Sequence, residues 1–464
     1  MKGSSIVAAI DIGTTKVVAI IGKKDPSGHI EVIGMGETIS TGVKRGMVLN
    51  IEETINAIHK AVETAQNMAG VKISEAYVGI AGQHIKSVKS RGSINTDVRN
   101  EEINKSDVER LIENMYGIPI NPGEQILHIL PQSFIVDNET DIKNPVGMYG
   151  KRLEGNFHIV IGQTAAANNI NKCVARNNIT PVGLILEPLA SSRAILTDDE
   201  KEIGVALVDI GGGTTDIAIY YDGIICHTAV VPFGGNVITS DIKQAYAILE
   251  RQAESLKLQH GSAFPSSLDD DYLITIPGLK GRDPKEISCN SLAHIIQARI
   301  DEIFGAIYYQ IETSGFGDKL GAGIVITGGG SLLKNLPQRV SYITGKDIRI
   351  GYPNEYLKSD VIKEINHPRF STSIGLILLG FEQTKIVNFI EEEKPAIEIT
   401  EPVHEIQAEE DVTISATEEQ NSYRPEDYKE EEIEHSDNTN KENKKPGWFG
   451  RMVDNLFDYK DTKI

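Results

Sequence analysis

Two short stretches of the sequence combine an aspartate, glycines and threonines in an order that suits phosphate chemistry. In VDIGGGTTDIAIY (Val208–Tyr220), Asp209 ends an apolar strand. The turn residues that follow are Gly211, Gly212, Gly213, Thr214 and Thr215. Glycines let backbone N–H groups turn toward a ligand, and such a turn forms a nest for phosphate oxygens. Asp209 is placed to hold a phosphate-bound Mg²⁺ through water. Alone, the pattern is equally compatible with an ordinary tight hairpin.

A second copy of this design lies near the N-terminus. In AAIDIGTTKVVAI (Ala8–Ile20), Asp11 ends the apolar strand and the turn consists of Gly13, Thr14 and Thr15. Lys16 either reaches a phosphate as a point charge or is a solvated strand lysine, and the sequence favours neither. Two such hairpins about two hundred residues apart predict two related halves that close on one nucleotide.

Glu187 lies between the two hairpins, after an apolar strand and before a helix, in VGLILEPLASSRAIL (Val182–Leu196). As an ordinary residue it is a first-turn acid that the helix dipole favours. In a nucleotide cleft it orients the attacking water, as phosphoryl transfer requires.

Two later segments carry a second glycine run and a charged pair at helical spacing. GIVITGGGSLLKNL (Gly323–Leu336) places Gly328, Gly329 and Gly330 between a strand and a helix start, which lets the backbone pass closely under a nucleoside or phosphate. Glu254 and Lys257 share one face of a predicted helix over Ala253–Gly261. By itself this spacing is more often an exposed ion pair worth ~0.3 kcal/mol.

The elements that must position these residues alternate strands with helices. Apolar residues at helical spacing predict a core-packing helix over Ile51–Ala69, and a long helix is predicted over Leu292–Ser314. From Gln83 the character changes to short strands and Pro-Gly turns, with a helix over Ser106–Tyr116 capped by Ser106. This predicts a small inserted subdomain. The last ordered element is predicted to end near Phe381.

The charge of the chain is unevenly distributed. The 464 residues carry a net charge of −20, and 19 acidic against 4 basic residues between 391 and 442 account for −15 of it. The remainder is only mildly acidic, so nothing indicates a nucleic-acid partner. The three cysteines are scattered without metal-ligand spacing, as expected in a reducing cytoplasm. The apolar runs are too short or too charged for a signal peptide or a spanning helix, which predicts a cytoplasmic body.

The C-terminal part has a different character. Residues 386–445 are rich in Glu, Asn and Thr and predict a disordered, self-repelling linker. Residues 446–460 predict an amphipathic helix that suits a membrane interface, although docking on a partner or on the body is the alternative. Its polar face carries Asp454 and Asp458, where membrane helices are usually basic. Its apolar face consists of Trp448, Phe449, Met452, Val453, Leu456 and Phe457.

The ordered set of two Asp-Ile-Gly hairpins, Glu187-Pro188 and the Gly328–Gly330 run is similar to the actin, Hsp70 and sugar-kinase superfamily. Within it the chain resembles the FtsA family of bacterial cell-division proteins over about residues 6–385. The segments that carry the resemblance are LHILPQSFIVDN, IKNPVGMYGKRLEGNFHIV, LASSRAILTDDEKEIGVALVDIGGGTTDIAIY and GGNVITSDI.

The resemblance implies an α/β, actin-like two-lobed ATPase fold of duplicated ribonuclease-H-like halves. It implies a first core lobe over 1–82 and 163–201, an FtsA-type insertion over 83–162, a second core lobe over 202–241 and 305–385, and a smaller subdomain over 242–304. Asp11, Asp209 and Glu187 are then the metal-associated and water-orienting acids. Glu254 and Lys257 line the adenosine side, above Gly328–Gly330.

The function that the resemblance implies is an ATP- and Mg²⁺-binding protein with at most weak ATPase activity. It self-assembles into filaments on the cytoplasmic face of the inner membrane at the division septum. There it anchors FtsZ filaments to membrane lipids and binds other division proteins. The alternatives are a rod-shape or pilus-assembly type of actin-like ATPase, a kinase on the same fold, and an Hsp70-like chaperone. No substrate-binding β domain for a chaperone follows the ATPase body in the sequence.

Overall fold

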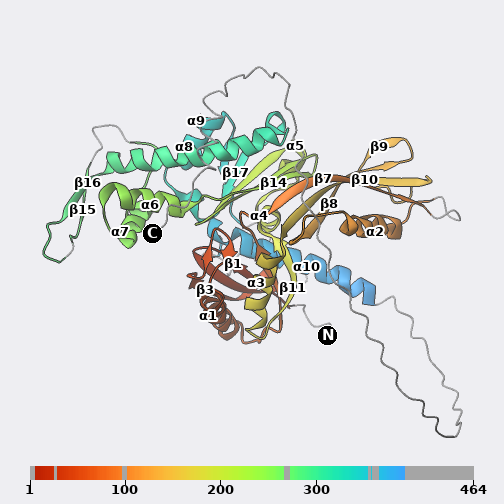
Figure 1. Ribbon diagram of the computed structural model, residues 1–464, viewed down its shortest axis with the longest axis horizontal. Helices are drawn as coiled ribbons and strands as arrows, with labels where there is room; N and C mark the ends of the chain where they lie inside the picture. Colours follow the sequence, from red (N-terminus) through yellow and green to blue (C-terminus); the bar gives the residue numbers. More distant parts are fainter. Residues whose placement is uncertain are drawn as a thin grey trace, which may run out of the picture. The chain divides into compact units, whose positions relative to one another are not determined.

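The computed structural model of the chain describes residues 6–25, 29–96, 102–265, 272–278, 280–353, 357 and 365–391 (Figure 1). Residues 1–390 form one compact unit. The predicted terminal helix and most of the predicted linker lie outside the described residues, so both stay predictions. None of the helices in the described part is both long and apolar enough to span a bilayer.

A five-stranded sheet carries the first Asp-Gly-Thr hairpin. Its strand order is β11-β6-β1-β2-β3, in which β1 to β3 are antiparallel while β6 and β11 extend the sheet in parallel. Predominantly apolar runs form these strands, which are β1 (Ile6–Ile12), β2 (Lys16–Lys24), β3 (Ile30–Ile39), β6 (Glu75–Ile80) and β11 (Thr180–Leu186).

Helices α1 (Ile51–Ala69) and α3 (Thr164–Ala175) cover one face of this sheet. The helix predicted over Ile51–Ala69 is confirmed with the same bounds. It starts where the Asn50 side chain accepts a hydrogen bond from Glu53 N, and it ends at Gly70, whose φ of 67° is the left-handed conformation that glycine tolerates.

A second five-stranded sheet carries the other hairpin and repeats the connection order of the first. The order is β14-β13-β12-β17-β18, again three antiparallel strands followed by two parallel ones. This repetition agrees with the two related halves expected from the hairpin motif. The strands are β12 (Val205–Ile210), β13 (Thr215–Tyr221), β14 (Ile224–Val231), β17 (Ile324–Thr327) and β18 (Ile348–Ile350).

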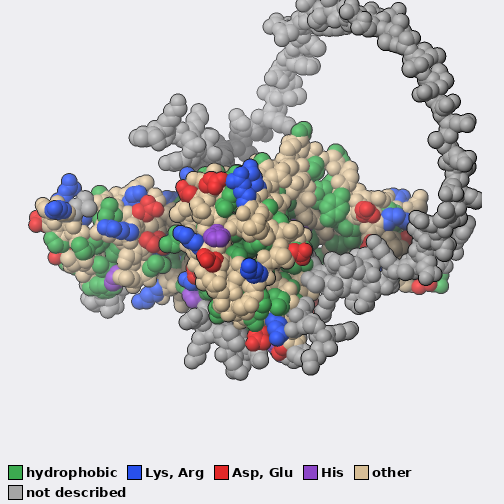
Figure 2. All heavy atoms as spheres, turned by 90° about the horizontal axis from the view of Figure 1, so that it is seen from below, with side chains coloured by type: hydrophobic (Ala, Val, Ile, Leu, Met, Phe, Trp, Pro, Cys, Tyr) green, Lys and Arg blue, Asp and Glu red, His purple; other side chains and the backbone are tan. Residues whose placement is uncertain are grey.

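The outer side of the second half is helical. Buried residues of its helices and of the β15–β16 hairpin pack with the second sheet in one apolar cluster. The elements are α6 (Gly235–Tyr246), α7 (Glu250–His260), β15 (Leu273–Ile276), β16 (Lys285–Ser288), α8 (Cys289–Thr313) and α9 (Leu336–Thr344). A short helix, α5 (Asp198–Ile203), precedes β12. Acidic and basic side chains are interspersed on the face shown in Figure 2.

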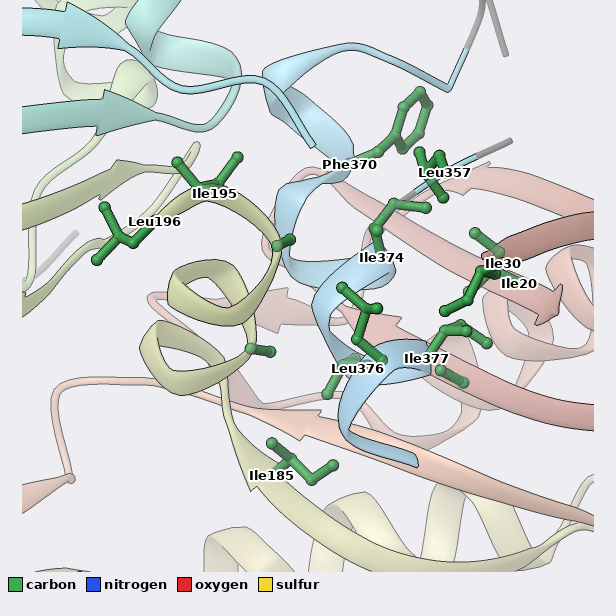
Figure 3. Close-up of a cluster of buried hydrophobic side chains, with 14 of the residues drawn as sticks. Ile20, Ile30, Ile185, Ile195, Leu196, Leu357, Phe370, Ile374, Leu376 and Ile377 are labelled. Atoms are coloured by element: carbon green, nitrogen blue, oxygen red, sulfur yellow. The ribbon is translucent and has the colours of Figure 1, made fainter. Parts of the chain in front are cut away.

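Two helices pack between the sheets and join the halves. α4 (Glu187–Ile195) follows the last strand of the first sheet, and α10 (Ser371–Glu391) follows the second half. Figure 3 shows Ile374, Leu376 and Ile377 of α10 pointing into the apolar cluster that both halves share. At the crossing a Cβ built on Gly375 would overlap the carbonyl oxygen of Ala190. The two helices are therefore in backbone contact there.

The predicted insertion forms a four-stranded sheet in the order β7-β10-β8-β9, packed against helix α2. The elements are β7 (Lys86–Asn95), α2 (Lys105–Asn114), β8 (Glu124–Val136), β9 (Glu139–Ile142) and β10 (Arg152–Gln163). The expectation of short strands is wrong, because β8 and β10 have 13 and 12 residues. Irregular register steps within their pairing let these long strands bend.

Two predicted boundaries are also wrong. Asn104, not Ser106, caps α2: its backbone is extended and its Oδ1 accepts from Asp107 N at 3.1 Å, whereas Ser106 already lies in the first helical turn. At the other end of the chain, α10 continues to Glu391, past both Phe381 and the linker start predicted at position 386. The sequence has neither glycine nor proline from there until Pro395, so no residue breaks the helix earlier.

Candidate functional site

The two Asp-Gly-Thr turns are closed by equivalent backbone hydrogen bonds. In the first, Gly13 N donates to Lys16 O at 3.0 Å, and in the second, Gly211 N donates to Thr214 O at 2.9 Å. The buried Thr215 Oγ1 additionally donates to Phe233 O at 2.8 Å, which ties the second turn to the segment that leads into α6. Both turns are thus closed by backbone bonds between corresponding residues.

The tips of these two turns are in direct contact. A Cβ built on Gly213 would lie 2.5 Å from Thr14 Oγ1, and a Cβ on Gly212 would overlap the Thr15 side chain. Only glycine permits this approach. The sequence predicted that the hairpins share one site, and the structure brings the predicted residues of both turns together.

Strand periodicity directs Asp11 and Asp209 into the same space. Alternate residues of a strand point to opposite faces. Asp11 lies on the same face of its strand as Val7 and Ala9, and Asp209 lies on the same face as Leu207. Val7, Ala9 and Leu207 all belong to the apolar cluster between the sheets. Both carboxylates are buried, 5% and 9% exposed.

Hydroxyl groups of the two connecting helices hold these aspartates. Ser191 Oγ of α4 donates to Asp209 Oδ2 at 2.5 Å, and Thr372 Oγ1 of α10 donates to the same oxygen at 3.1 Å. Ser373 Oγ donates to Asp11 Oδ2 at 2.9 Å. Burial raises the pKa of Asp209, and the bonds from Ser191 and Thr372 oppose that rise. None of these three hydroxyls was predicted from the sequence, although the run Ser371-Thr372-Ser373 at a helix start was a visible signal.

Glu187 begins α4 and is half-buried beside the two aspartates. A Cβ built on Gly79 of β6 would lie only 3.2 Å from Glu187 Oε1. Because glycine has no Cβ, the strand leaves room for the Glu187 carboxylate. Burial, and then the charges of Asp11, Asp216 and Asp209, raise the pKa of Glu187 well above its ordinary value. Its ionised form therefore needs a compensating cation.

Asp216 is a fourth carboxylate that the sequence analysis did not assign to the site. It pairs directly with Asp209 across β12 and β13. It is buried, its Oδ1 has no hydrogen-bond partner, and Thr214 Oγ1 donates to Oδ2 at 3.3 Å. Burial, and then the charge of Asp209, raise the pKa of Asp216 to about 8. The cross-strand position relative to Asp209 was the signal available in the sequence.

Asp216→Asn is expected to stabilise the protein in the absence of nucleotide and magnesium. Because the folded-state pKa is about 8 and the ordinary value is 3.8, the folded carboxyl stays protonated while the unfolded one ionises. The free energy of unfolding therefore falls as the pH rises from about 4 to about 8, by on the order of 6 kcal/mol. Asparagine keeps the shape without this loss.

Urea unfolding at pH 5 and pH 8 measures the effect of Asp216→Asn. The variant is expected to exceed the native chain in stability at pH 8 and to have a smaller pH dependence. Asp222→Asn, which changes an exposed carboxylate just after the same strand, is the matched control. If the free energy of unfolding depended on pH equally in the native chain and in Asp216→Asn, the pKa of Asp216 would not be raised in the folded state.

The donor set fits a magnesium ion held through water. Asp11, Asp209, Asp216 and Glu187 lie close enough to influence one another, and the buried Asp216 Oδ1 accepts no hydrogen bond. A hydrated cation supplies both the positive charge and the donors. Across the described residues, no three His, Cys, Asp or Glu side chains are grouped to ligate one ion directly. Asp11 and Asp209 remain the predicted metal-associated acids.

Lys16 connects the first hairpin to the second half. Its Nζ donates to the carbonyl oxygen of Arg369 at 2.5 Å and lies 5.5 Å from the ring centroid of Phe370. The sequence left open whether Lys16 is a phosphate ligand or a solvated strand lysine. Its ammonium here is engaged by protein groups, so a phosphate contact stays a prediction.

Glu254 and Lys257 lie beside the second turn. Gly235 N donates to Gly211 O at 2.9 Å, and Lys257 Nζ donates to Gly235 O at 3.0 Å. The Lys257–Glu254 ion pair has an N···O distance of 2.7 Å, and the Lys257 side chain is only 11% exposed. The pair is therefore built into the structure behind the turn, and is not the freely exposed pair that spacing alone suggested.

The glycine run after β17 packs against the second aspartate. Gly328 has a φ of 81°, and a Cβ there would overlap Asp209 Oδ1. A Cβ on Gly330 would overlap Ile210, whereas a Cβ on Gly329 would only reach van der Waals contact with Arg369 Cβ, at 3.9 Å. The structure places these glycines at the site, and the predicted contact with a nucleoside is untested.

Two family models match the chain. The model described as "Cell division protein FtsA" matches residues 206–375. The model described as "SHS2 domain inserted in FTSA" matches residues 82–161, which contain the four-stranded sheet and α2 except for the last residues of β10.

Solved structures share the fold at low sequence identity. The PilM–PilN type IV pilus biogenesis complex matches with a TM-score of 0.57 at 14% identity, covering 81% of this chain and 98% of that one. MreB5 of Spiroplasma citri bound to ADP matches with a TM-score of 0.50 at 16% identity, covering 83% and 98%. The chain therefore has a mixed α/β, actin-like fold that carries an inserted SHS2 domain.

Several relatives named "Cell division protein FtsA" are similar over most of the chain. The one from Pseudomonas aeruginosa is 39% identical, covering 82% of this chain and 91% of the relative. Those from Neisseria meningitidis and Escherichia coli K12 are 40% and 34% identical, covering 80% and 81% of this chain and 89% and 90% of the relatives. With this identity on top of the shared fold and the two family models, the chain belongs to the FtsA family of cell-division proteins.

Proposed function

We propose that the chain binds ATP with Mg²⁺ where the two hairpin turns meet. The observation that carries the proposal is the direct contact of two glycine-threonine turns beside four inward-facing carboxylates. The turn N–H groups bind phosphate oxygens, and Asp11 and Asp209 hold the ion through water. When bound, the ion supplies charge neutralisation of the phosphates. The solved structure of MreB5, which has ADP bound, supports a nucleotide in this fold.

Glu187 is the residue that we assign to hydrolysis, which at most is slow. The start of α4 holds it next to Asp11 and Asp209, where it orients a water toward the terminal phosphate. The raised pKa of Glu187 favours its protonated form in the absence of a cation. A nearby cation favours the ionised form, which accepts a hydrogen bond from this water. Glu254, Lys257 and Gly328–Gly330 line the adenosine side in this proposal.

At the level of the cell, we assign the protein the role of a membrane adaptor in division. Membership in the FtsA family supports this role. Filaments of the chain lie on the cytoplasmic face of the inner membrane at the septum, bind the tubulin-like FtsZ and recruit other division proteins. The predicted amphipathic helix over 446–460 contacts the lipids. Family membership also weighs against the rod-shape, pilus-assembly, kinase and chaperone alternatives.

Asp11→Ala and Asp209→Ala test the nucleotide site. Each removes one buried carboxylate that we place on the ion, so the affinity for Mg-ATP is expected to fall at least about tenfold, ~1.4 kcal/mol. The difference in ATP affinity between magnesium and EDTA buffers is expected to shrink. Isothermal titration calorimetry measures both quantities. Glu63→Ala, an exposed acid on α1, is the control. Unchanged affinity and unchanged magnesium dependence would remove the assignment.

The FtsZ contact is predicted on the smaller subdomain, over 242–304. Arg251→Glu with Leu258→Glu alters the exposed surface of α7, where Leu258 is 73% exposed. Pull-down with the C-terminal peptide of FtsZ is expected to lose at least roughly tenfold in bound peptide, since both changes introduce negative charge into the predicted contact. Lys60→Glu with Met68→Glu on the exposed side of α1 is the matched control. Retained binding by the α7 variant would place the contact elsewhere.

A further inference from the structure

A short β-hairpin, with two residues in each strand and two in the turn, lies beside the first phosphate turn. β4 (Val43–Lys44) pairs with β5 (Met47–Val48), and Arg45 and Gly46 form the turn between them. Their φ angles are 50° and 75°. Two successive positive φ angles are typical of a type I′ turn. Gly46 N donates to Thr14 Oγ1 at 3.1 Å, so the tip of this hairpin is bonded to the turn that meets Gly213.

Close packing holds the hairpin in this place. A Cβ built on Gly46 would lie 2.7 Å from Gly82 Cα and 2.8 Å from Ala81 O. Both contacts lie just beyond the end of β6 (Glu75–Ile80), the strand that accommodates Glu187 at Gly79. The hairpin therefore borders the phosphate turn and also the strand against which the proposed water-orienting acid packs.

Arg45 is an unexpected residue type at its position. A type I′ turn favours Asn, Asp or Gly at the first central position, because other side chains are disfavoured at positive φ. Residues that go against such a local preference are typical of functional sites. The Arg45 side chain is exposed, and within the described part of the chain it has neither an ion pair nor a hydrogen bond. Its guanidinium is thus available to a ligand.

The electrostatics of the cleft call for such a cation. Four carboxylates gather at the site where a polyphosphate is proposed to bind. The lysines assigned to the site from sequence are engaged elsewhere: Lys16 donates to Arg369 O, and Lys257 is paired with Glu254. A guanidinium presents two parallel N–H groups to a phosphate and keeps its charge at any physiological pH.

We propose that Arg45 binds the terminal phosphate of the nucleotide and makes the site selective for the triphosphate over the diphosphate. The hairpin attachment at Thr14 holds Arg45 within side-chain reach of the phosphate turn. This assignment rests on the proposed function, because it requires that ATP binds between the two hairpins. It adds to that function a residue that senses whether the third phosphate is present.

Calorimetric titration of the full-length protein with Mg-ATP and with Mg-ADP tests the assignment. Arg45→Gly removes the guanidinium and suits a φ of 50°, so its melting temperature without nucleotide is expected to equal or exceed that of the native chain. Its affinity for Mg-ATP is expected to fall about tenfold and its affinity for Mg-ADP less than about twofold. Arg45→Lys keeps the charge and is expected to retain part of the preference for ATP.

The control and the contradicting outcomes separate this assignment from the proposed function. Arg176→Gly removes an arginine from the same half that pairs with Glu52 at 2.6 Å, and the preference for ATP is expected to persist. Equal losses for ATP and ADP in Arg45→Gly, or no loss for either, would overturn the role of Arg45 while leaving ATP binding established. A native chain that binds neither nucleotide would contradict the proposed function, and with it this assignment.

Discussion

Trp448→Glu combined with Phe457→Glu is expected to release the assembled protein from lipid vesicles. The predicted terminal helix offers six apolar side chains to the membrane, and a single helix of this kind binds weakly and reversibly. Asp454 and Asp458 on its polar face oppose an anionic surface by up to ~1 kcal/mol per charge. Assembly compensates, because neighbouring helices on one filament raise the avidity by roughly 10²–10⁴. Two glutamates on the apolar face remove the contact of each helix with the membrane, so the avidity of the filament no longer holds it there.

Vesicle flotation of the assembled protein measures the effect. The native chain is expected to float and the double variant to remain in the dense fraction, with ATP binding unchanged. The isolated peptide Lys444–Ile464 is expected to partition poorly, since it lacks neighbours. Asn455→Glu with Thr462→Glu adds the same charge away from the predicted apolar face and is the control. If the Trp448 and Phe457 variant still floats, the helix is not the anchor, and the alternative of a helix docked on a protein surface replaces it.

Gly375→Val is expected to destabilise the body and to impair the nucleotide site at the same time. The backbones of α4 and α10 touch at this glycine, so any side chain there overlaps Ala190 and must push the helices apart. Such overpacking costs about 3 kcal/mol in a well-packed core. The hydroxyls of Thr372 and Ser373 lie less than one helical turn away and hold Asp209 and Asp11. A displaced α10 therefore also misplaces both carboxylates.

Urea unfolding and Mg-ATP titration of Gly375→Val measure the two effects together. Gly183→Val is the matched control, because a Cβ at Gly183 in β11 meets no atom within 4 Å and valine suits a strand. The control is expected to keep both stability and affinity. A Gly375→Val protein with native stability would show that the two helices separate easily at their crossing.

Local patterns in the sequence were sufficient for the motifs and for much of the secondary structure. The apolar runs before Asp11 and Asp209 predicted strands, and the glycines after them predicted the turns, because each depends only on neighbours in the chain. The periodicity of Ile51–Ala69 predicted that helix with its exact bounds. Strand alternation also carries the information that both aspartates face the same side as their apolar partners.

Long strands and helix ends were less predictable for a physical reason. β8 and β10 are long because they pair with each other and with β7 and β9 in a bent sheet, a choice that their own residues do not reveal. The cap of α2 depended on whether Asn104 or Ser106 has the extended backbone, which is a matter of one residue. Such boundaries depend on strand pairing with distant segments and on the backbone conformation of single residues at the ends of the element.

Consecutive residues of the chain were enough to predict two related Asp-Gly-Thr hairpins and the family of the chain. The groups that surround the carboxylates come from segments far apart in the sequence, so local patterns do not predict them. Ser191, Thr372 and Ser373 come from helices that follow different halves of the chain, and they reach Asp209 and Asp11 because α4 and α10 cross between the sheets. The raised pKa of Asp216 likewise depends on burial and on Asp209 across the sheet. Contacts between distant segments arise from packing, whereas a motif consists of consecutive residues and can therefore be recognised in the sequence.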